Sequence, residues 1–89
     1  MLTYNELEGI ELNTGVCLYD LNQIELRTLR EALYLVEYNY SIRVSARDLC
    51  VSKSTLHRDV NNVLPHLSIE LYDQVRTILK KHRDIRYHK

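Results

Sequence analysis

Residues 42–64, with the sequence IRVSARDLCVSKSTLHRDVNNVL, decide the fold that this chain is expected to adopt. Apolar residues at helical spacing on both sides of a short polar segment predict two short helices joined by a tight turn. The inner faces of the two helices are expected to carry Ala46, Leu49, Val51, Leu56 and Val60. The opposite face of the second helix is polar or basic. This arrangement is typical of a helix-turn-helix, in which the second helix enters the major groove of DNA.

The sequence predicts an all-α fold, a small helical bundle in which two longer helices flank this pair. The first longer helix is expected over about residues 23–39, with Asn22 and Glu25 as a capping pair at its start. Its apolar stripe is predicted to consist of Leu26, Leu29, Leu33, Val36 and Tyr40. The other longer helix is expected over residues 69–86, capped by Ser68.

The helices of the pair are expected at about residues 44–49 and 53–62, with Ser52 as the N-cap of the second. Pro65 is expected to end that second helix or to follow its end, because the residue before a proline is pushed out of helical geometry. Asp59 is predicted to pair with a basic neighbour, because a carboxylate that faced DNA phosphates would repel them.

A helix-turn-helix domain over residues 22–89 is predicted to follow an N-terminal extension, residues 1–21. The extension contains both glycines, Gly9 and Gly15. It is expected to form either a small hairpin around residues 13–15 or a loosely ordered arm. A chain of 89 residues suffices for one compact domain with a single core.

The two halves of the chain carry opposite charge, although the formal net charge is zero. Residues 1–40 contain two cations and seven anions, whereas residues 41–89 contain ten cations, five anions and all four histidines. A partner responds to the local field, so the basic half is suited to a polyanion such as DNA. The alternative is that charges of both signs simply solvate the surfaces of the helices.

From about Gln23 to His88 the sequence resembles the stage III sporulation protein D family, small DNA-binding transcription regulators of endospore-forming bacteria. The resemblance is carried by VSKSTLHRDV at residues 51–60, Leu64 with Pro65, the run ending in Val75, Ile78 and Leu79, and HRDIR at residues 82–86. It implies that the third helix docks in the major groove, and that the protein both activates and represses sporulation genes. It assigns the recognition helix to Ser52, Lys53, Ser54, Thr55, His57, Arg58 and Asn61.

The family also uses a basic C-terminal region to hold the DNA backbone, which here is expected to begin with Lys80, Lys81, Arg83 and Arg86. Arg43, just before the first helix of the pair, is a further candidate contact. The turn of the pair departs from the family pattern, because Cys50 stands where glycine is usual. If Cys50 keeps the positive φ of that turn, the strain is of order 1 kcal/mol, and we expect the turn to survive.

Other classes of protein are not favoured by the sequence. It has no phosphate-binding glycine loop, no GxSxG motif and no plausible catalytic carboxylate pair, so we expect neither an enzyme nor a small-molecule substrate. The histidines and cysteines lack the paired spacing of zinc sites, and neither a metal nor a cofactor is expected. No run of about 18 apolar residues is present and the N-terminus does not resemble a secretion signal, so we expect no membrane association. The two isolated cysteines fit a reducing compartment, the cytoplasm.

These observations predict a sequence-specific DNA-binding transcription regulator. Its partner is double-stranded DNA, bound by a monomer or a weak dimer. The alternative is a protein interaction module, in which the helix pair is only a packed scaffold and the acidic half docks onto a basic partner. The three tyrosines Tyr34, Tyr38 and Tyr40 lie at helical spacing and are expected to pack together rather than to stack on bases.

Overall fold

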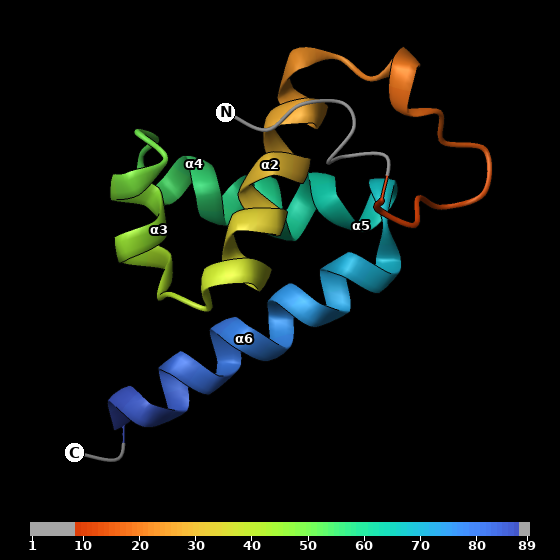
Figure 1. The fold of residues 1–89 in the computed structure, drawn as a ribbon. Helices are drawn as coiled ribbons and strands as arrows, with labels where there is room; N and C mark the ends of the chain where they lie inside the picture. Colours follow the sequence, from red (N-terminus) through yellow and green to blue (C-terminus); the bar gives the residue numbers. More distant parts are fainter. Residues whose placement is uncertain (1–8, 88–89) are drawn as a thin grey trace.

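The computed structural model describes residues 9–87, and the side chains of residues 9–82 (Figure 1). The helical elements are η1 (Leu18–Asp20), α2 (Gln23–Tyr38), α3 (Ile42–Asp48), α4 (Lys53–Arg58), the π-helical turn η2 (Asp59–Val63), α5 (Leu64–Leu67) and α6 (Ile69–Tyr87). No strand occurs within residues 9–87. The predicted all-α fold is therefore confirmed.

Helix α2 begins and ends with polar caps. The Asn22 side chain accepts a hydrogen bond from the backbone N–H of Glu25 at 2.8 Å, and the Glu25 carboxylate accepts one from the backbone N–H of Asn22 at 2.9 Å. This is the capping box that the sequence predicts. At the other end Asn39 adopts a left-handed conformation with φ 58°, which stops the helix.

The buried face of α2 matches the predicted stripe in part: Leu26, Leu33 and Val36 pack against the core, but of the stripe only Leu29 is fully buried. Leu29, Ala32 and Leu35 are fully buried, whereas Tyr40 is 44% exposed. Apolar residues lie on more than one side of α2, so their spacing alone does not decide which side faces the core. Packing against the other helices determines which side of α2 is buried.

Helices α3 and α4 form the predicted pair, an arrangement consistent with a helix-turn-helix. The Ser41 side chain accepts a hydrogen bond from the backbone N–H of Val44 at 3.3 Å, so α3 begins two residues before the predicted start at residue 44. Ser52 is the N-cap of α4, as predicted, and accepts from the backbone N–H of Thr55 at 3.0 Å. Between the two helices Cys50 has φ 59°, the positive value that the family turn requires.

The prediction that Pro65 ends the helix that begins at Lys53, here α4, was wrong. Helical geometry continues from α4 through η2 into α5, where Pro65 occupies the first turn. Within η2 the Leu64 N–H donates to the carbonyl of Asp59, five residues earlier, which widens the helix immediately before the proline. We attribute the tolerance of Pro65 to this wider turn, which relieves the clash between a proline ring and the carbonyl four residues before it.

The core lies where α2 crosses the α4–α5 segment and α6 runs along both (Figure 1). Leu56 of α4, Val60 of η2 and Leu64 of α5 are fully buried there. Helix α6 contributes Leu71 and Val75 to this core. The inner faces predicted for the helix pair are likewise confirmed, with Ala46, Leu56 and Val60 buried, and Leu49 and Val51 packed against the core.

The predicted hairpin around residues 13–15 does not form. The backbone turns there, with Val16 N–H donating to the carbonyl of Asn13 at 3.0 Å, but the flanking residues pair with another part of the chain. Asn13 donates its backbone N–H to the Leu67 carbonyl and its amide to the Pro65 carbonyl, both at 2.8 Å. Its side-chain oxygen accepts from the N–H of Ile69. The first part of the predicted extension, residues 1–8, lies outside the described residues.

Ser68, the predicted cap of α6, also bonds to the segment that precedes α2. Its hydroxyl donates to the carbonyl of Glu11 at 2.6 Å and accepts from the N–H of Leu71 at 3.2 Å. Leu18 of η1 is buried in the core. The segment before α2 thus closes over the junction between α5 and α6. None of the helices in the described part of the chain has both the length and the apolar composition needed to cross a membrane.

Candidate nucleic-acid interface

Helix α4 presents a polar surface on the side away from the core. Lys53, Ser54, His57 and Arg58 are exposed, whereas Leu56, between them in sequence, is fully buried. Among the described side chains, none forms a hydrogen bond or ion pair with Lys53, Ser54 or Arg58. These three side chains have their polar groups available to a ligand.

Ser52 and Thr55 are engaged at the start of α4. The Ser52 hydroxyl donates to the Thr55 hydroxyl at 2.8 Å, in addition to accepting from its backbone N–H. Thr55 is half-buried. Ser52 and Thr55, two members of the predicted recognition set, therefore fix the first turn of the helix.

Asn61 lies in η2, one helical turn beyond His57. Its amide donates to the His57 carbonyl at 2.8 Å and lies 3.0 Å from Nδ1 of the His57 ring. The amide therefore holds the ring of His57 in place. Contact between Asn61 and DNA stays a prediction.

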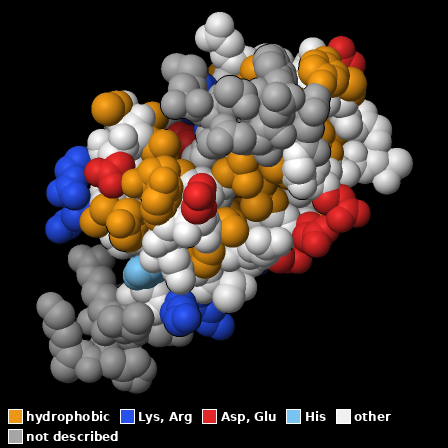
Figure 2. All heavy atoms as spheres, in the orientation of Figure 1, with side chains coloured by type: hydrophobic (Ala, Val, Ile, Leu, Met, Phe, Trp, Pro, Cys, Tyr) orange, Lys and Arg blue, Asp and Glu red, His pale blue; other side chains and the backbone are white. Residues whose placement is uncertain are grey.

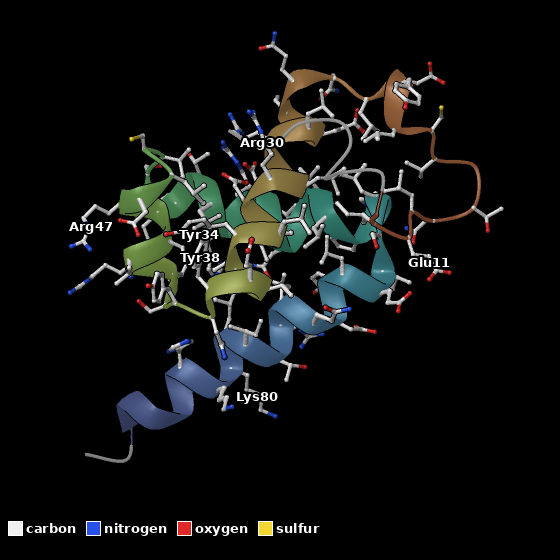
Figure 3. The ribbon with its side chains drawn as sticks, viewed as in Figure 1. Glu11, Arg30, Tyr34, Tyr38, Arg47 and Lys80 are labelled. Carbon is white, nitrogen blue, oxygen red and sulfur yellow. The ribbon has the colours of Figure 1, made fainter. Side chains whose placement is uncertain are left out.

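The other predicted contacts come from different helices. Arg43 is exposed on α3, and Lys80 and Lys81 are exposed on α6. Figure 3 shows Lys80 pointing away from the bundle in the second half of α6. The side chains of Arg83 and Arg86 lie outside the described residues.

His82 fixes this half of α6 to the end of α2. Its Nε2 lies 2.6 Å from the carbonyl of Asn39, the C-cap of α2. Asn39 is only two residues from Ser41, the N-cap of α3. The contact brings the Lys80–Lys81 turn close to the linker that leads into the helix pair.

Beneath the exposed face, α2 holds the end of α4 through an ion pair. The Arg27 Nε lies 2.9 Å from Oδ2 of Asp59, and Arg27 Nη2 lies 3.2 Å from Oδ1. Asp59 is 1% exposed. The prediction that Asp59 pairs with a basic neighbour is confirmed, and the two parallel bonds fix its orientation as well as its charge.

Comparison with known proteins assigns the family. The sequence model of the stage III sporulation protein D family matches residues 21–89. The chain belongs to this family. The stage III sporulation protein D of Bacillus subtilis (strain 168) is 39% identical over 64 residues, which cover 72% of this chain and 69% of the relative. No solved structure matches the chain.

Membership in the stage III sporulation protein D family confirms the resemblance seen in the sequence. It supports the prediction of a transcription regulator of sporulation. The matched range contains the whole of the α3–α4 pair and all of α6.

Glu31 is a buried ionisable residue that the sequence analysis did not identify. It is 1% exposed, and neither carboxylate oxygen has a hydrogen-bond partner among the described residues. Burial raises the pKa of Glu31 to about 8, and the neighbouring carboxyl group of Asp59 with its negative charge raises it further. The nearest signal in the sequence was the position of Glu31 four residues after Arg27, a spacing that also occurs in ordinary surface pairs.

The three tyrosines pack together where α2 meets α3. The ring centroids of Tyr34 and Tyr38 lie 4.6 Å apart, and those of Tyr38 and Tyr40 lie 5.8 Å apart. The Tyr34 hydroxyl donates to Asp48 of α3 at 2.6 Å, and this bond raises the pKa of Tyr34 to about 12. Figure 3 shows Tyr34 and Tyr38 between the two helices, and Figure 2 shows apolar atoms gathered on this face. The expected packing of the rings is confirmed.

Proposed function

We propose that this protein is a sequence-specific DNA-binding transcription regulator of sporulation whose helix α4 enters the major groove. The observation that carries the proposal is the division of α4 into a fully buried apolar side and an exposed side of unpaired polar groups. A helix divided in this way is rigidly held and still has donors free for base edges and phosphates.

The exposed residues of α4 have different roles in this proposal. Arg58 offers a planar fork of donors that fits guanine O6 and N7 or a phosphate. Lys53 supplies a point charge at the start of the helix, which suits a phosphate. His57, whose ring lies beside the Asn61 amide, is exposed on the same side and offers a ring N–H donor.

Residues 22–89 form the DNA-binding unit in this proposal, and residues 1–21 are an extension whose Glu11, Asn13 and Leu18 contact it. Lys80 and Lys81 contact the DNA backbone beside the helix pair, and Arg43 contributes from α3. The protein binds duplex DNA as a monomer or weak dimer and acts by binding alone. Its place of action is the cytoplasm, where bacterial DNA lies.

The test is fluorescence anisotropy with a duplex that carries a site selected from a random pool. The logarithm of the affinity should fall linearly with the logarithm of the salt concentration, because binding releases counterions from the phosphates. The Arg58→Ala variant should bind the selected site more weakly by about 1–3 kcal/mol.

Arg76→Ala is a matched control. Arg76 is an exposed arginine of α6 that lies 5.5 Å from the ring centroid of Tyr72 and is not among the residues proposed to contact DNA. Its replacement should leave the affinity nearly unchanged. An affinity indifferent to salt, or equal losses in the two variants, would overturn the proposal and favour a protein interaction module.

A further inference from the structure

Two carboxyl groups share the contact between α2 and the end of the recognition helix. Glu31 of α2 and Asp59 of η2 are each 1% exposed. Arg27, one turn before Glu31, forms a close ion pair with Asp59 and a longer one with Glu31. The charged groups that influence Glu31 are Asp59, Arg27 and Arg30.

Arg27 lies closer to Asp59 than to Glu31. Its guanidinium makes two hydrogen bonds to Asp59, whereas its Nε lies 3.9 Å from the nearest oxygen of Glu31. If both acids were ionised, Glu31 would be a buried carboxylate with no hydrogen-bond donor, beside a second negative charge. Such a charge is costly to bury, and a proton removes that cost.

A proton on Glu31 also resolves the missing hydrogen bonds. A neutral carboxylic acid has an O–H that donates, and the ionised Asp59 beside it has lone pairs left after its two bonds to Arg27. We propose that Glu31 is a protonated acid in the folded protein and, by donating its proton to a hydrogen bond with Asp59, positions the recognition helix. The role of α4 in DNA recognition is taken from the proposed function, whereas the protonation of Glu31 is independent of it.

The proton on Glu31 makes folding sensitive to pH. The pKa of Glu31 is about 8 in the folded protein, against an ordinary value of 4.5. Between these two values the folded protein holds a proton that the unfolded chain has released. The stability that this proton provides is therefore complete below pH 4.5, decreases as the pH rises, and is lost above about pH 8.

The direct test is ¹³C NMR of the Glu31 side-chain carboxyl in the wild-type protein, where the titration midpoint should lie near 8. Urea unfolding of the Glu31→Gln variant provides a second test, because glutamine keeps a donor to Asp59 but does not titrate. Between pH 4.5 and about 8, the unfolding constant of the wild type should rise relative to that of Glu31→Gln. The rise should approach about tenfold per pH unit, the limit for one proton.

Glu37→Gln is the control, because Glu37 is an exposed carboxylate on the same helix. Its unfolding profile should follow that of the wild type. A midpoint for Glu31 near 4.5, or a Glu31→Gln profile parallel to the wild type, would overturn the assignment of the proton.

The positioning role is tested by measuring DNA affinity well below and well above the folded-state pKa of about 8, where Glu31 is protonated and ionised respectively. The affinity of the wild type should fall relative to that of Glu31→Gln as the pH rises, because an ionised Glu31 repels Asp59. A pH-independent ratio of the two affinities would overturn the positioning role. If neither protein binds duplex DNA, the proposed function fails and the positioning role with it, while the NMR midpoint still decides the protonation of Glu31.

Discussion

The two sides of the α4–η2 segment differ in what their side chains contact. On the outer side, Lys53 and Arg58 are exposed, with no bond to another described side chain. On the inner side, Leu56 is fully buried and Asp59 is held by Arg27. Neighbouring residues of one helix therefore have different roles. Those on the inner side stabilise the fold, and those on the outer side are available for binding. Substitutions on the two sides should therefore affect different measurements.

The largest effect on stability is expected for Leu56→Ala. Removal of this fully buried side chain leaves a cavity and should lower the free energy of unfolding by about 2–5 kcal/mol. Arg58→Ala, two residues away on the exposed side, should change it by no more than about 0.5 kcal/mol. Urea denaturation of both variants measures the contrast. Equal losses would contradict the division of the helix into two sides.

A smaller effect is expected for Ser52→Ala, at the boundary between the two sides. The substitution removes the N-cap of α4 and should cost about 1 kcal/mol of stability. Ser54→Ala removes a hydroxyl from the exposed side of the same turn and is the control, with an expected change within about 0.5 kcal/mol. Thermal unfolding followed by circular dichroism separates the two. A Ser52→Ala variant as stable as Ser54→Ala would show that the cap contributes nothing.

The smallest effect is expected for Cys50→Gly, and it is a gain. Cys50 has φ 59°, a conformation that glycine adopts without strain, so the stability should rise by up to about 1 kcal/mol. The gain is limited because glycine also increases the entropy of the unfolded chain. Cys17→Ser, at an exposed cysteine with φ −112°, is the matched control and should leave the melting temperature nearly unchanged. A lower melting temperature for Cys50→Gly would contradict the assignment of strain to this position.

The sequence was a good guide where a structure depends on residues close together in the chain. The capping box of Asn22 and the caps at Ser52 and Ser68 were predicted, and strain at Cys50 was expected if the turn kept its positive φ, which it does. Each depends on hydrogen bonds or backbone geometry within about one helical turn. The predicted pairing of Asp59 was also correct, although its partner Arg27 lies 32 residues away.

The sequence was a poor guide where distant segments compete for the same groups. The hairpin around residues 13–15 was a reasonable local prediction, but Asn13 bonds instead to the junction of α5 and α6, more than 50 residues away. Pro65 was expected to end a helix and instead lies inside one, after a π-helical turn. Neither the wider turn nor the distant partner can be recognised from neighbouring residues.

The sequence alone indicated the order of the main helices, the N-caps at Asn22, Ser52 and Ser68, the helix pair and the resemblance to the family. Only the tertiary structure decided which side of α2 is buried, and with it the burial of Glu31 beside Asp59. The physical reason is the range of the forces involved. Helix formation and capping are satisfied within a few residues, whereas the cost of burying a charge depends on every element that packs around it.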